Sequence, residues 1–145
     1  MNKDGIEILN LISVNTDLLT HTIDNIIIDI KNEKFKEYLC KILNDAEVLN
    51  KDAKMILKAN KTEIDKLSLL EKAQNLISIK LSKGKETRSF ATIFYLNCSE
   101  ILPDLYFAKT DFALSNSEEK IMLEGLIKLI EDCIQESKKY FTVLD

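Results

Sequence analysis

The sequence EKFKEYLCKILNDAEVLNKDAKMILKAN, residues 33–60, decides the fold class. Its apolar residues recur three and four positions apart, so at about 100° per residue they share one side of a helix. These residues are Phe35, Leu39, Ile42, Ala46, Leu49, Ala53, Ile56 and Leu57, and the opposite side carries Lys36, Glu37, Lys41, Asn44, Lys51 and Lys58. The pattern predicts an amphipathic helix whose apolar side packs on a core.

The residues before this stretch predict another amphipathic helix, from about Ile6 to Ile30. Its apolar side is made of Ile8, Leu11, Ile12, Leu18, Leu19, Ile23, Ile26 and Ile30, and its polar side of Asn10, Ser13, Asp17, His21, Asp24 and Lys31. A single helix over both stretches would be unusually long for a chain of this size. We therefore expect a tight turn at residues 31–34.

The rest of the chain continues the helical periodicity. Residues 62–81 carry apolar side chains on all sides, which predicts burial by other helices or by another subunit, and Gly84 suits a left-handed helix end. A helix from about Glu86 past Tyr106 contains Pro103, which predicts a kink or a break. A capping-box pattern at Ser115 begins a last helix that reaches about Phe141.

No stretch alternates in the way a half-buried strand does. The sequence therefore predicts an all-α fold, an antiparallel four-helix up-down bundle, or five segments if Pro103 divides one helix. The chain has 145 residues, of which 46% are hydrophobic and 30% charged, a composition typical of one globular domain over residues 1–145.

Composition also bears on partners and location. The net charge is −4 and Arg88 is the single arginine, so the sequence argues against nucleic acid as a partner. No uncharged apolar run approaches the roughly 20 residues of a membrane helix, and the start of the chain is unlike a signal peptide. We expect a cytoplasmic protein that does not bind membranes. Cys40, Cys98 and Cys133 are widely spaced and odd in number, which predicts buried, reduced thiols.

The residues needed for common catalytic sites are missing. His21 is the single histidine, so a di-metal site with two Glu-x-x-His motifs cannot be assembled, and no Ser-His-Asp or Cys-His arrangement can be assigned. A phosphate-binding glycine loop is also absent from the sequence. We expect a non-enzymatic protein without a cofactor.

Two groups of polar residues are the candidate sites. Asp17, His21 and Asp24 lie at i, i+4 and i+7 on one helix side, where they form a possible site for a divalent cation such as zinc or nickel, or an ordinary solvated surface.

The second group, Asn15, Thr22 and Asp29, is spaced by seven residues within the apolar side of the same helix. Such a polar seam either specifies the helix register, with or without water, or forms a polar channel that binds a ligand.

Four stretches resemble uncharacterised ferritin-like bundle proteins of anaerobic spore-forming bacteria. They are ILNLI at 8–12, KNEKFKEYL at 31–39, SIKL at 78–81 and IEDCIQESKKYF at 130–141. The resemblance implies a cytosolic, ferritin-like four-helix bundle without an established activity. The metal ligands of true ferritins have no counterpart here.

These observations lead to two functional hypotheses. The first is a non-enzymatic helical module that binds itself, as a homodimer, or another protein, because residues 62–81 are apolar on all sides. The alternative is a degenerate ferritin-like bundle that binds a metal or a small apolar ligand between its helices, because of the polar seam and Pro103.

Overall fold

The structure is a computed structural model that describes residues 2–65, 71, 75, 86–112 and 118–145. Its described residues form four long helices and no strand: α1 (Lys3–Ile26), α2 (Glu33–Ala59), α4 (Thr87–Asp111) and α5 (Glu118–Lys138). A short 3-10 helix, η1 (Ile27–Asp29), follows α1. The prediction of an all-α helical fold is confirmed. The predicted helix ends at Gly84 and Ser115 lie outside the described residues.

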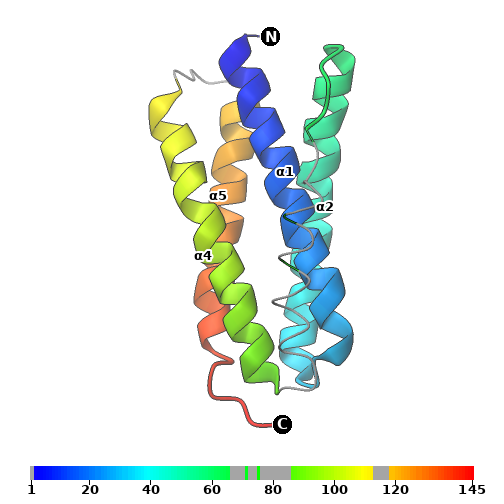
Figure 1. Ribbon diagram of the computed structural model, residues 1–145, viewed down its shortest axis with the longest axis vertical. Helices are drawn as coiled ribbons and strands as arrows, with labels where there is room; N and C mark the ends of the chain where they lie inside the picture. The colour runs from blue at the N-terminus through cyan, green and yellow to red at the C-terminus, as the bar shows by residue number, and fades with distance from the viewer. Residues whose placement is uncertain (1, 66–70, 72–74, 76–85, 113–117) are drawn as a thin grey trace.

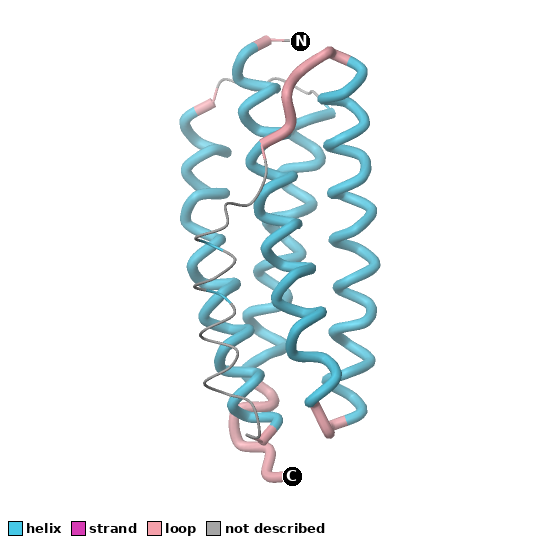
Figure 2. The backbone as a smooth tube through the Cα atoms, turned by 45° about the vertical axis from the view of Figure 1, so that its right-hand side comes forward, coloured by secondary structure: helices cyan, strands magenta, loops and turns pink. Residues whose placement is uncertain are grey.

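The four helices lie side by side as a bundle (Figure 1). Figure 1 shows α1 descending from the N-terminus, α2 rising beside it, α4 rising and α5 descending toward the C-terminus. The turned view in Figure 2 shows the turn between α1 and α2 and the chain after α5 at the lower end of the bundle. Among the described helices, the closest neighbours are α1 with α2 and α4 with α5, which form two pairs.

Two asparagines start the first pair of helices. The Asn2 side-chain oxygen accepts a hydrogen bond from the Gly5 N–H (2.8 Å), and the Asn32 oxygen accepts one from the Phe35 N–H (3.0 Å). Each bond pairs a backbone N–H that the helix itself leaves unsatisfied. Because Asn32 must cap α2, the preceding Ile30 is extended, and α1 ends at Ile26 rather than at the predicted Ile30.

Pro103 does not break α4. The helix runs without interruption from Thr87 to Asp111. Of the two predicted outcomes, a kink or a break, the break is therefore wrong. Buried residues on both sides of the proline, Ile101 and Leu105, pack into the core and hold the chain in one helix. Core packing on both flanks thus outweighs the lost backbone hydrogen bond.

Phe35 joins the two helix pairs at one end of the bundle. Its ring is completely buried, stacks on Tyr140 with 4.6 Å between centroids, and meets Phe94 of α4 edge-on at 6.3 Å. Aromatic pairs at such distances add to the free energy gained by burial. One side chain thereby connects the start of α2 to α4 and to the segment that follows α5.

A polar contact reinforces the same end of the bundle. One carboxylate oxygen of Asp145 accepts hydrogen bonds from the N–H and the hydroxyl of Thr87, both at 2.6 Å. The Thr87 hydroxyl oxygen in turn accepts a bond from the Asn32 N–H at 3.3 Å. The carboxylate caps the N-terminus of α4, where the helix dipole favours negative charge. Hydrogen bonds from the Thr87 hydroxyl and N–H lower the pKa of Asp145.

A membrane-spanning segment is not found in the described part of the chain, because none of its helices combines the necessary length with sufficient apolarity.

We expect Phe35→Ala to lower the free energy of unfolding by about 3–5 kcal/mol, because it leaves a cavity at the junction of the two helix pairs. Urea denaturation followed by circular dichroism measures the change. Phe107→Ala is the matched control, since this ring is 64% exposed and its loss should change the free energy by less than about 0.5 kcal/mol. Equal effects of the two substitutions would contradict the role of Phe35.

We expect the stabilisation by Asp145 to depend on pH. Because the folded-state pKa of its carboxyl lies below the unfolded value, the stabilisation is present at neutral pH and is lost as pH falls through that lowered pKa. Thermal unfolding should therefore show wild type more stable than Asp145→Asn at pH 7, with the difference shrinking in acid. A difference that stays constant down to acid pH would show that the carboxylate charge contributes nothing.

Candidate functional site

The predicted metal-binding trio lies on one side of α1, but its members have different surroundings. Asp17 accepts hydrogen bonds from Lys54 and Asn50 of α2, both at 3.0 Å from one carboxylate oxygen. The ring of His21 lies beside Asn25, and Asp24 is exposed. Among the described residues no group of three His, Cys, Asp or Glu side chains is arranged to bind a metal ion. The structure therefore gives Asp17 a lysine as its partner.

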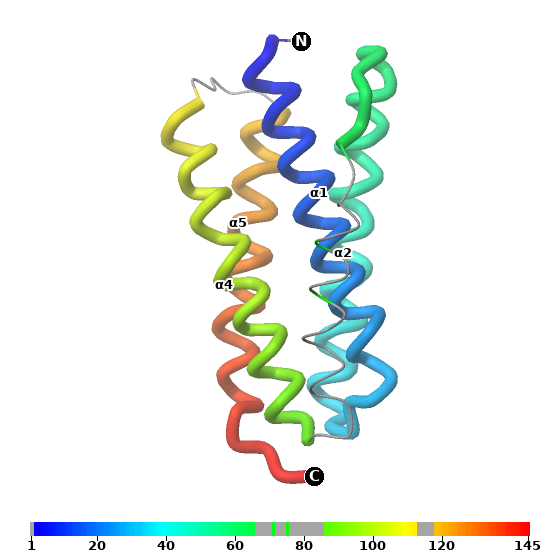
Figure 3. Tube along the Cα trace, in the orientation of Figure 1, coloured from blue at the N-terminus to red at the C-terminus, as the bar shows by residue number. Residues whose placement is uncertain are grey.

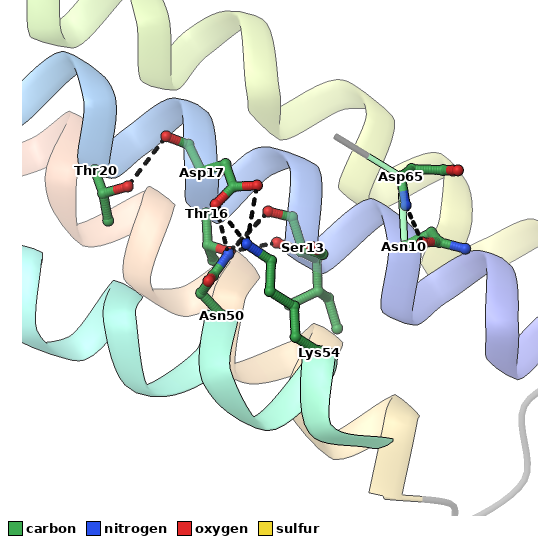
Figure 4. A network of polar contacts seen from close by, with 9 residues as sticks. Asn10, Ser13, Thr16, Asp17, Thr20, Asn50, Lys54 and Asp65 are labelled. Atoms are coloured by element: carbon green, nitrogen blue, oxygen red, sulfur yellow. Dashed lines mark hydrogen bonds and ion pairs between the residues drawn. The ribbon is translucent and has the colours of Figure 1, made fainter. Parts of the chain in front are cut away.

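A polar network joins α1 to α2 at this point (Figure 4). The Asn50 side-chain amide donates hydrogen bonds to the Ser13 carbonyl (3.1 Å), the Thr16 hydroxyl (2.9 Å) and the Asp17 carboxylate (3.0 Å). Ser13 and Thr16 are completely buried. The prediction that Ser13 lies on an outward polar side is wrong, because α2 packs against that side of α1. The small side chains leave room for Asn50.

The hydrogen bonds of this network contribute more to the stability of the fold than its ion pair does. Lys54 and Asp17 form an ion pair at 3.0 Å, but each side chain keeps about a third of its surface exposed. Solvent and salt screen such a pair, so it contributes about 0–1 kcal/mol. The hydrogen bonds of Asn50 are the larger contribution, because they pair buried polar groups that would otherwise lose their bonds to water.

The predicted polar seam is partly inside the bundle. Thr22 is completely buried, and its hydroxyl accepts a hydrogen bond from Asn75, whose amide also donates to Asn97 of α4. The distances are 3.0 and 3.2 Å, so Asn75 bridges α1 and α4. The other two seam residues lie elsewhere: Asn15 is half-buried and bonds to its own helix, and Asp29 is exposed in η1.

One atom of this bridge is unsatisfied. The side-chain oxygen of Asn75 is buried and has no hydrogen-bond partner among the described residues. A buried polar oxygen without a partner costs about 1–3 kcal/mol, so this oxygen is a place where a water or a small polar group would bind.

Two of the three cysteines are buried in the core. Cys98 of α4 and Cys133 of α5 are both completely buried. Burial first, and the nearby Cys133 thiol second, raise the pKa of the Cys98 thiol well above its usual range. Thiols of this kind are poor nucleophiles. Cys40 is exposed, so the prediction that all three thiols are buried is wrong for that residue.

A groove lies between α2 and α5. Its volume is about 500 Å³, and its lining residues are Lys41, Ile42, Gly125, Lys128, Leu129, Glu131, Asp132 and Gln135. A β-carbon added at Gly125 would meet no atom within 4 Å, so the groove is open above this glycine. The Tyr38 hydroxyl donates a hydrogen bond of 2.6 Å to Asp132, one of the lining residues.

Exposed apolar side chains extend the groove. Val48 and Met55 follow Lys41 at intervals of seven residues on α2, and Ile121 precedes Gly125 by four residues on α5, so each shares a side with a groove residue. Their exposed fractions are 58%, 66% and 67% for Val48, Met55 and Ile121. We call the groove together with these three side chains and Asp45 of α2, which lies four residues after Lys41, the α2/α5 face. The sequence pattern did not lead us to predict this face, although the seven-residue spacing of Val48 and Met55 could have indicated it.

Comparison with known proteins found no similar protein. No family model matches the chain, and neither the curated proteins nor the solved structures contain a match. The function must therefore be argued from the geometry and chemistry described above.

We expect Asn50→Ala to lower the free energy of unfolding by about 1–3 kcal/mol, because the substitution removes the amide that bridges α1 and α2. Chemical denaturation measures this value. Asn44→Ala is the matched control, since Asn44 is an exposed asparagine of the same helix and its loss should cost less than about 0.5 kcal/mol. A neutral Asn50→Ala would contradict a structural role for the network.

Proposed function

We propose that this protein is a non-enzymatic helical module that associates with a second copy of itself through the α2/α5 face. The observation that carries the proposal is a set of three large apolar side chains, Val48, Met55 and Ile121, which are exposed on the helix sides that also carry groove residues. Burying the part of each side chain that is still exposed would contribute about 1–2 kcal/mol. Contiguous exposed apolar surface with a polar rim is typical of protein interaction sites.

The chemistry of the described side chains supports a non-enzymatic role. The Cys98 thiol has a raised pKa in the core, Asp17 is paired with Lys54, and the Tyr38 hydroxyl is held by Asp132 with a raised pKa caused mainly by burial. None of these three groups is an activated nucleophile or base. The proposal therefore assigns the α2/α5 face to association rather than to catalysis.

We also propose that the bundle is antiparallel and ferritin-like. In Figure 1, α2 ends and α4 begins at opposite ends of the molecule, so the chain between Ala59 and Thr87 has to cross the full length of the bundle. One such crossover between two helix pairs is the topology of ferritin-like folds. A cytoplasmic location fits the three free cysteines.

The second candidate function is a bundle that binds a small ligand or a metal between its helices. The unpaired oxygen of Asn75, beside the buried hydroxyl of Thr22, favours it. A bound ligand would have to donate a hydrogen bond to this oxygen. Extra mass on the native chain, lost in Asn75→Leu, would support this function; native mass equal to the sum of the chains would count against it.

We expect sedimentation velocity to give a mass of two chains for the unmodified protein. Met55→Glu and Ile121→Glu should each weaken association at least about tenfold, because each would place a charge in an apolar contact. Ile28→Glu is the matched control: Ile28 is 82% exposed but belongs to η1, outside the α2/α5 face. A single-chain mass at all accessible concentrations would refute the proposed function.

A further inference from the structure

We propose that two chains pack about a two-fold axis that runs along the groove, so that α2 of each chain lies on α5 of its partner. This inference rests on the proposed function and gives it a geometry. It follows from the heights of side chains along the two helices, from the direction in which these side chains lean, and from their charges.

The hydrogen bond from Tyr38 to Asp132 places α2 and α5 in register. The two helices run in opposite directions (Figure 3), so moving forward along α2 corresponds to moving backward along α5. At 1.5 Å per residue, Val48 lies about 15 Å above Tyr38, while Gly125 and Ile121 lie about 10 Å and 16 Å above Asp132. Val48 is therefore level with the space between Gly125 and Ile121.

A two-fold axis parallel to the helices keeps every residue at its own height. It exchanges the two walls of the groove, so the α2 wall of one chain meets the α5 wall of the other. Val48, whose side chain leans down toward the N-terminus of its helix, then points into the space just above the partner's Gly125, where no side chain stands. A β-branched side chain opposite a glycine packs as a projection into a hollow, and both chains make this contact.

The charges of the two walls are complementary under the same operation. Lys41 and Asp45 lie on the α2 wall, and Lys128 and Asp132 lie on the α5 wall. Side chains lean toward the N-terminus of their helix, so Lys41 leans down to the level of Asp132, and Lys128 leans up to the level of Asp45. Each chain would therefore form two ion pairs, from Lys41 to the partner's Asp132 and from Asp45 to the partner's Lys128.

An axis perpendicular to the helices gives a different contact. If it passed at the height of Val48, it would invert the heights, bring Val48 of one chain close to the partner's Val48, and place Lys41 near the partner's Met55 rather than near an acidic side chain. The two arrangements therefore differ in which pair of positions can be linked covalently.

The test uses disulfide trapping in a Cys40→Ser background, which removes the exposed thiol. Val48→Cys and Gly125→Cys are made in separate chains, mixed, and oxidised with copper phenanthroline. We expect a covalent heterodimer of the two variants and no covalent dimer from Val48→Cys alone. Covalent dimers of Val48→Cys alone would overturn the parallel axis.

Charge reversal provides the second measurement. Asp45→Lys should weaken association about tenfold, because it replaces two ion pairs of the dimer by two like-charge contacts, and Asp45→Lys with Lys128→Glu should restore it. Asp52→Lys is the control, an exposed aspartate about two helix turns further from Lys128 than Asp45 is. Failure of the double variant to recover would contradict the geometry.

The two proposals fail in distinguishable ways. If the unmodified protein sediments as a single chain, the proposed function is wrong. If it sediments as two chains while the mixture of Val48→Cys and Gly125→Cys does not link, self-association stands and the two-fold axis along the groove is wrong.

Discussion

The burial of Phe35 is the contact on which the arrangement of the two helix pairs depends. Its ring stacks on Tyr140 and meets Phe94, so one side chain at the start of α2 is held by α4 and by the segment after α5. The hydrogen bonds among Asn32, Thr87 and Asp145 lie at the same end. Side chains far apart in sequence thereby fix the relative position of the two pairs, which no contact within α1 and α2 alone would do.

The groove between α2 and α5 lies near the same end of the bundle. Tyr38, one turn after Phe35, bonds to Asp132, which lines the groove. Gly125 contributes no side chain to fill it, and Val48, Met55 and Ile121 remain exposed beside it. The buried polar contacts of Asn50 and Thr22 hold α1 against its neighbours on other sides. A well-packed core beneath an open, partly apolar face is the physical basis of the proposed association.

Helical periodicity predicted α2 to within one residue, because its apolar and polar sides are cleanly separated and Asn32 caps it. It extended α1 too far, because the isoleucines after residue 26 continue the apolar pattern although the turn to Asn32 requires an extended chain. Helical periodicity shows which residues share a side of a helix, but it does not show which other helix covers that side. It therefore predicted Ser13 on the solvent-exposed side, although α2 covers this residue. The α2/α5 face was not predicted because a groove above a glycine such as Gly125 cannot be recognised from the pattern of hydrophobic residues.

Hydroxyl-radical labelling of Met55 tests the central claim, that a second chain covers the α2/α5 face, most directly. Met55 is 66% exposed in the single chain and its sulfur reacts readily, while Phe107 on α4 provides an internal reference with a similar exposed fraction. If a second chain covers this face, labelling of Met55 relative to Phe107 falls as the protein concentration rises and recovers on dilution. A ratio that stays constant over the whole concentration range would contradict the account.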